Sequence, residues 1–157
     1  MPDALPRATR IATAASFAAA DRIVLDFDER FRRRKRYRSA DGIDFLLDLP
    51  EAQLLRDGDG LVLEDGRVIR VCAAEEPLVE VRGATAAQLV RLAWHLGNRH
   101  LPVELQAGRI LIREDHVIEQ MLRGLGAELR PVRAPFNPEG GAYGEHNRST
   151  HRHQHDH

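Results

Sequence analysis

The chain has 157 residues, of which 43% are hydrophobic, enough for one ordinary domain or two small ones. Lysine and arginine number 23 against 24 aspartates and glutamates, so the net charge of -1 indicates neither a nucleic-acid nor a membrane-surface partner. No run reaches the ~18 apolar residues that a membrane span needs. Cys72 is the only cysteine, which excludes an intrachain disulfide and fits a reducing compartment, so we expect a cytoplasmic protein.

Two interpretations apply to the start of the chain. Arg7 and Arg10 precede the alanine-rich run Ile11–Ala20, which faintly resembles a secretory signal with an Ala-x-Ala site. The run lacks leucine and is only weakly hydrophobic. We therefore favour an edge strand that enters the first domain.

The first half of the chain predicts β structure. Short apolar or β-branched stretches recur at about ten-residue spacing, which is typical of a small barrel or sandwich. These stretches are Ile23–Phe27, Ile43–Leu49, Gly60–Glu64 and Arg67–Cys72. The last two flank Asp65–Gly66, a strong hairpin signal. We predict an all-β domain over residues 1–75, with a linker at Ala73–Pro77.

The segment Arg30–Arg38 holds seven basic residues in nine, with Phe31 and Tyr37 between them. Basic residues interleaved with aromatics are the sharpest argument for nucleic acid in this chain. In a strand, however, alternate residues would face solvent while the two aromatics pack. Because the whole chain is neutral, we favour a solvated or partner-docking face over nucleic-acid binding.

The second half of the chain alternates strand and helix patterns. Strands are predicted at Leu78–Arg82, Leu101–Leu105, Arg109–Ile112 and Glu128–Val132. Thr85–Gln88 matches a capping box that opens a helix ending at Gly97. Asp115 caps a second helix, whose end is marked by Gly124 and Gly126. The order β-α-β-β-α-β predicts a ferredoxin-like domain, so the fold class is α+β.

We assign this ferredoxin-like domain to residues 76–142 and a disordered tail to residues 143–157. The last twelve residues contain no apolar side chain and five of the eight histidines. These are His146, His151, His153, His155 and His157. Imidazole is the commonest protein ligand for Zn, Cu and Ni, so the tail histidines are candidate metal ligands. An expression tag or a neutral polar tail is the alternative, although Arg152, Gln154 and Asp156 interrupt the histidines.

Three further histidines are candidate ligands. His95 and His100 are five positions apart, about 140° around a helix, so they would not chelate one ion from a continuous helix. One imidazole is a weak site, but two copies of His100 on the twofold axis of a homodimer would make a better one. His116 is either a peripheral ligand assisted by Glu114 or a solvated histidine at a helix start, which the helix dipole disfavours when charged.

Other functions are weighed against the same residues. No nucleophile motif, phosphate-binding loop or His-Glu-x-x-His motif is present. A zinc-dependent hydrolase would need three buried ligands and a general base in a cleft, and no base lies near the tail histidines. A basic RNA-binding module is the third hypothesis. We favour a metal-binding protein that is not an enzyme.

Several ordered motifs resemble the urease accessory protein UreE family of nickel metallochaperones. In the second half these are His95–Pro102, Asp115–Val117 and Phe136–Gly144, the last leading into the histidine tail. In the first half they are Leu25–Arg30, Leu54–Asp59 and Glu64–Gly66. The resemblance spans nearly the whole chain.

The resemblance implies a first domain akin to a peptide-binding module and a ferredoxin-like metal domain. It implies a homodimer in which His100 of each subunit binds one nickel ion, with tail histidines completing or supplementing the site. Zinc or copper could bind in place of nickel. The family delivers Ni(II) to the urease apoprotein complex through the GTPase UreG. Glu114 stands where some members carry histidine, which weakens the case for a peripheral site at His116.

Overall fold

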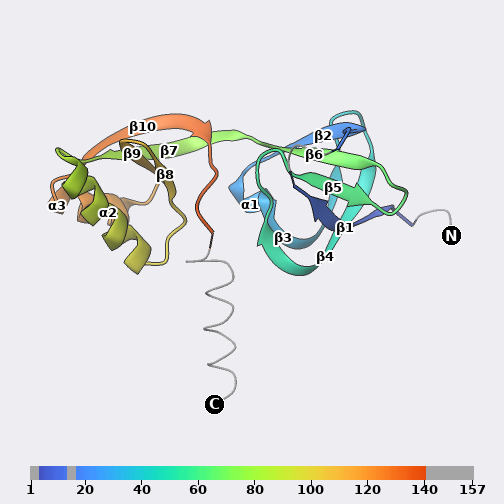
Figure 1. Cartoon of the computed structure of the whole chain (residues 1–157), viewed down its shortest axis with the longest axis horizontal. Helices are drawn as coiled ribbons and strands as arrows, with labels where there is room; N and C mark the ends of the chain where they lie inside the picture. The colour runs from blue at the N-terminus through green and yellow to red at the C-terminus, as the bar shows by residue number, and fades with distance from the viewer. Residues whose placement is uncertain (1–3, 14–16, 141–157) are drawn as a thin grey trace, which may run out of the picture. The chain divides into compact units, whose positions relative to one another are not determined.

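The computed structural model describes residues 4–13 and 17–140 (Figure 1). The chain divides after Ala74 into two compact units, each with its own hydrophobic core. The first unit is almost entirely β and the second combines a sheet with two helices, so the α+β fold class is confirmed. Among the described residues, no helix is long and apolar enough to cross a membrane.

The first unit is one curled sheet of six strands in the order β2-β6-β5-β1-β4-β3, which confirms the barrel-like form of the prediction. Its elements are β1 Arg7–Ala12, β2 Asp21–Leu25, α1 Phe27–Arg30, β3 Phe31–Arg38, β4 Asp44–Leu54, β5 Gly60–Leu63 and β6 Val68–Ala73. Alternate residues of the strands fill the core, and Phe45, Leu47 and Ile69 are fully buried there.

The predicted hairpin is confirmed. β5 and β6 pair antiparallel, and Gly66 sits in their turn at φ 92°, a conformation that favours glycine. The Gly66 N–H donates to the Leu63 carbonyl over 2.9 Å. The local turn signal therefore sets the register of this pair.

Two predictions for the start of the first unit are wrong. β1 is not an edge strand, because it pairs with β4 on one side and β5 on the other and buries Ala8 completely. The predicted strand at Ile23–Phe27 ends at Leu25, because Asp26 caps the one-turn helix α1. The Asp26 and Glu29 side chains each accept the other residue's backbone N–H, a capping box that halts the strand.

The second unit has the predicted ferredoxin-like topology. Its elements are β7 Glu75–Arg82, α2 Ala86–Asn98, β8 Glu104–Gln106, β9 Arg109–Arg113, α3 His116–Gly124 and β10 Glu128–Pro135. The sheet order is β10-β7-β9-β8, and all three neighbouring pairs are antiparallel. Leu92 and Leu96 of α2 pack with Leu122 of α3 in the core shared with the sheet. Both helices therefore contribute to one core on the sheet.

The predicted linker at Ala73–Pro77 is wrong. β6 runs to Ala73 and β7 begins at Glu75, so Ala74 alone separates the two strands. Glu75 pairs with Pro135 at the far end of β10. This pairing makes the predicted linker residues from Glu75 onward part of the second sheet, which their local composition does not indicate.

Candidate metal site

The end of α2 presents His100 in an unusual backbone conformation. Its φ is 57°, the one positive φ among the non-glycine residues that the structure describes. The predicted stop at Gly97 is wrong, because the helix continues to Asn98 and Arg99 is its C-cap. His100 thus occupies the position after the cap, where glycine is the usual residue. Its N–H donates to the Gly97 carbonyl over 3.1 Å.

The fold holds His100 in this conformation from both sides. Leu96 is fully buried four residues before it, and Leu101 packs against the same hydrophobic core immediately after it. The His100 residue itself is exposed. A left-handed conformation costs an L-residue about 1–2 kcal/mol, and the packing of Leu96 and Leu101 on both sides holds His100 in it. Strain of this kind clusters at functional sites.

His95 has a different environment. It is half-buried on α2, and its ring meets the Trp94 ring edge-on, with centroids 5.1 Å apart. Trp94 itself is 65% exposed, so it is not a core residue of the described unit. His95 is thus part of a mostly apolar stretch of α2.

His116 is exposed at the first position of α3 and borders an open pocket of about 360 Å³. The neighbouring carboxylates serve the helix start. Asp115 accepts the backbone N–H groups of Val117 and Ile118, and Glu119 accepts that of Asp115. These bonds leave the two carboxylates less available to a metal ion.

The structure does not gather these histidines into one site. Within residues 4–13 and 17–140, no group of three or more histidine, cysteine, aspartate or glutamate side chains is arranged to hold a metal ion. The five tail histidines, from His146 to His157, lie outside the described residues. A complete ligand set at His100 would therefore need donors from the tail or from a second chain.

The segment that follows β10, residues 136–140, is hydrogen-bonded to the chain just after His100, and we call it the docked segment. The Glu139 N–H donates to the Val103 carbonyl over 2.7 Å, and the Asn137 N–H donates to Glu104 Oε1 over 2.7 Å. Phe136 is fully buried. Val103 is three residues beyond His100, so the docked segment leads towards the tail from the neighbourhood of the strained histidine.

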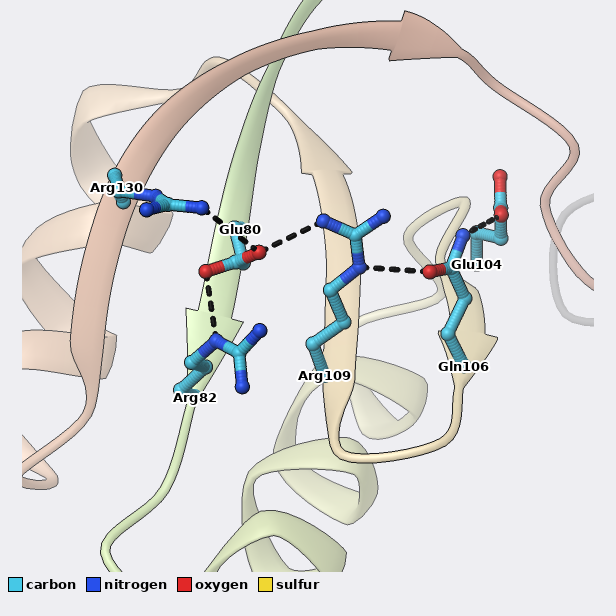
Figure 2. Close-up of polar contacts among 6 residues, drawn as sticks. All are labelled: Glu80, Arg82, Glu104, Gln106, Arg109 and Arg130. Atoms are coloured by element: carbon cyan, nitrogen blue, oxygen red, sulfur yellow. Dashed lines mark hydrogen bonds and ion pairs between the residues drawn. The ribbon is translucent and has the colours of Figure 1, made fainter.

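Sequence reasoning missed the polar network that anchors this segment (Figure 2). Glu80 of β7 is nearly buried, and its carboxylate accepts hydrogen bonds from Arg82 over 2.8 Å and Arg109 over 2.7 Å. Arg130 of β10 adds an ion pair at 3.6 Å. The hydrogen bonds from Arg82 and then Arg109 hold the pKa of Glu80 down at about 2.

The network continues across the sheet to the docked segment. Arg109 Nε donates to Gln106 Oε1 over 2.7 Å, and Gln106 donates in turn to Glu104. The other Glu104 oxygen accepts the Asn137 N–H. One chain of polar contacts therefore links β7, β9 and β8 to the segment before the tail. The sequence signal that could have indicated this network is Glu80, an acidic residue between Val79 and Val81 in a predicted strand.

Fold and site together define a two-unit α+β protein with exposed imidazoles and a docked C-terminal segment. The model for the UreE urease accessory protein N-terminal domain matches residues 4–74, and the model for the C-terminal domain matches residues 76–157. The chain belongs to the UreE urease accessory protein family. Proteins of this family are named as accessory proteins, in agreement with the prediction that the chain is not an enzyme.

Three relatives, each named urease accessory protein UreE, illustrate the similarity. The protein from Chelativorans sp. is 58% identical over 151 residues, 96% of this chain and 95% of its own. That from Rhodobacter capsulatus is 50% identical over 148 residues, 94% of this chain and 92% of its own. That from Rhodopseudomonas palustris (strain BisB18) is 56% identical over 138 residues, 88% of this chain but 65% of its own.

The strain at His100 predicts that two small substitutions there will differ in their effect on stability. We expect His100→Gly to exceed His100→Ala in unfolding free energy by about 1 kcal/mol, because glycine takes a positive φ without penalty. Urea unfolding of the two variants measures the difference. The control is the same pair at Asn98, the last helical residue, where alanine should be the more stable. Equal stability at His100 would show that its backbone is not strained.

The Glu80 network predicts a specific dependence of stability on pH. The folded-state pKa of about 2 lies below the usual 4.5, so the carboxylate's contribution is full above pH ~4.5 and is lost as the pH falls towards 2. We expect Glu80→Gln to lower the unfolding free energy at pH 7 by ~1.5–3 kcal/mol. The deficit should shrink on acidification. A deficit that is unchanged between pH 7 and pH 3 would contradict the assignment.

Proposed function

We propose that the chain is a nickel metallochaperone that binds Ni(II) as cargo and delivers it to the urease apoprotein complex during assembly of the urease metal centre. The observation that carries the proposal is the exposed His100, held in a left-handed conformation by the packing on both sides of it. Membership of the urease accessory family directs this metal function to urease. Zn(II) and Cu(II) are alternative ions for the same imidazoles.

The proposed site is His100 from each chain of a homodimer, supplemented by His146, His151, His153, His155 and His157. The docked segment supports this, because the Glu139 N–H donates to the carbonyl of Val103, three residues after His100. His146 is seven residues after Glu139, and seven extended residues span up to about 25 Å. The tail is therefore long enough to bring imidazoles to His100. His95 and His116 are secondary candidates.

An apolar surface on α2 supports the homodimer. Val90 is 70% exposed and Trp94 is 65% exposed, and the two lie one helical turn apart on α2, whose last residue, Asn98, is two positions before His100. Large apolar side chains side by side on a surface are typical of protein–protein contacts. Contact through this stretch of α2 on a twofold axis would supply the homodimer that a shared His100 site requires.

Delivery would proceed by ligand exchange. A surface site with few protein ligands releases its ion more readily than a closed site, and the tail offers further imidazoles along the way. We assign the receiving partner to the urease accessory GTPase UreG, acting in the cytoplasm on the urease apoprotein complex. Protons compete with metal for imidazole, so nickel should be released on acidification.

Nickel titration by calorimetry tests the site. We expect His100→Ala to remove the tightest binding step, because it removes the imidazole at the dimer axis. A chain truncated after Tyr143 should lose only the weaker steps, because it keeps His100 and loses all five tail histidines. His95→Ala is the comparison variant, and it should keep the tightest step because His95 is only a secondary candidate. If His100→Ala keeps the tightest step, the site at His100 is wrong.

The dimer surface predicts a change of mass. We expect Trp94→Glu to shift the chain towards the monomer, since it places a charge in an apolar contact. Light scattering after size exclusion measures the mass. Arg91→Glu is the control, because Arg91 is an exposed residue of the same helix whose change leaves the apolar surface intact. A dimer that persists in Trp94→Glu would place the contact elsewhere.

A further inference from the structure

The basic segment of the first unit forms the edge strand β3. Among the strands of the described residues, β3 pairs on one side only, with β4. Arg34, Arg36 and Arg38 recur at every second position, so they lie on one face of the strand, and we call them the arginine strip. Arg34 is exposed, as are Arg36 and Arg38.

The charge of the strip is only partly neutralised. Asp44 of β4 pairs with Arg38 over 3.3 Å, and Asp48 pairs with Arg7 of β1 over 3.4 Å. Both carboxylates opposite the strip are therefore engaged. Arg34 and Arg36 form no ion pair with any side chain in the described part of the molecule.

The two aromatic side chains of this segment, Phe31 and Tyr37, pack against other rings of the first unit. Tyr37 is 6% exposed and packs against Phe45, with ring centroids 5.9 Å apart. Phe31 stacks on Phe27 at 6.3 Å. Single-stranded nucleic acid is bound by aromatic faces on which bases stack, and these two rings are engaged within the unit. The segment thus offers cations along an edge strand without a stacking platform, which favours a polypeptide partner.

We propose that the arginine strip binds an extended acidic segment of a partner protein, with carboxylates at alternate positions. Alternate residues of a strand are about 6.6–6.8 Å apart, so such a segment lying along β3 would set successive carboxylates opposite Arg34 and Arg36. The edge of a sheet accepts an added strand through its main chain. This docking surface is separate from the metal function proposed above and does not depend on it.

Two features define the selectivity of the surface. Basic side chains on an edge strand repel the same strand of a second copy, so the strip opposes self-association while attracting an acidic strand. Beyond Arg38 the chain turns away, since the Ala40 N–H donates to the Arg22 carbonyl of β2. The docking stretch is therefore short, from Arg34 to Arg38.

Fluorescence anisotropy with two labelled peptides of equal composition tests the proposal on the full chain. The peptides are Thr-Asp-Thr-Asp-Thr-Asp-Thr, with alternating acids, and Thr-Thr-Asp-Asp-Asp-Thr-Thr, with the acids in a block. We expect the alternating peptide to bind more tightly and its affinity to fall with salt. Arg34→Glu combined with Arg36→Glu should weaken its binding by about tenfold or more.

Arg10→Glu combined with Arg22→Glu is the matched control, because it makes the same charge change at exposed residues of the same unit. It should leave binding nearly unchanged. The milder pair Arg34→Gln and Arg36→Gln repeats the test with less perturbation. Equal affinity for the two peptides, or equal loss in the two charge-reversed variants, would overturn the proposal. So would tighter, strip-dependent binding of a labelled single-stranded RNA.

Discussion

A single nearly buried carboxylate connects the parts of the second unit that matter for the proposed function. Glu80 draws arginines from β7, β9 and β10 to one point of the sheet, and one of them extends the contact through Gln106 and Glu104 to the segment after β10. The Glu80 side chain is 3% exposed, whereas those of the three arginines are 29–69% exposed, so the carboxylate is the member of the network that depends most on its partners. As a result, the last residues that the structure describes lie beside the segment that follows His100.

His100 itself shows how a fold can hold a residue against its local preference. Helix α2 continues beyond Gly97, the residue best suited to end it, and His100 occupies the left-handed position after the cap. The buried Leu96 and the packed Leu101 fix the path of the chain around this point. The strained backbone and the exposure of His100 are the two observations on which its proposed role as a ligand rests.

Much of the fold follows from local signals, whereas the site follows from long-range pairing. The Asp65–Gly66 turn and the caps at Thr85 and Asp115 act within a few residues, so the hairpin and both helix starts were predictable. The central place of β1 and the loss of the predicted linker depend on strands that pair across large sequence distances. The Glu80 network likewise needs the register of three strands. The end of α2 was mispredicted because packing at Leu96 and Leu101 outweighs the glycine signal.

X-ray absorption at the nickel edge would test the central claim most directly. The comparison is between the unmodified chain and His100→Gly, a substitution that suits the backbone at φ 57° and removes only the imidazole. With nickel supplied at one ion per two chains, the account predicts imidazole scattering that is clearly reduced in the variant. An identical spectrum from the two proteins would contradict a nickel site at His100.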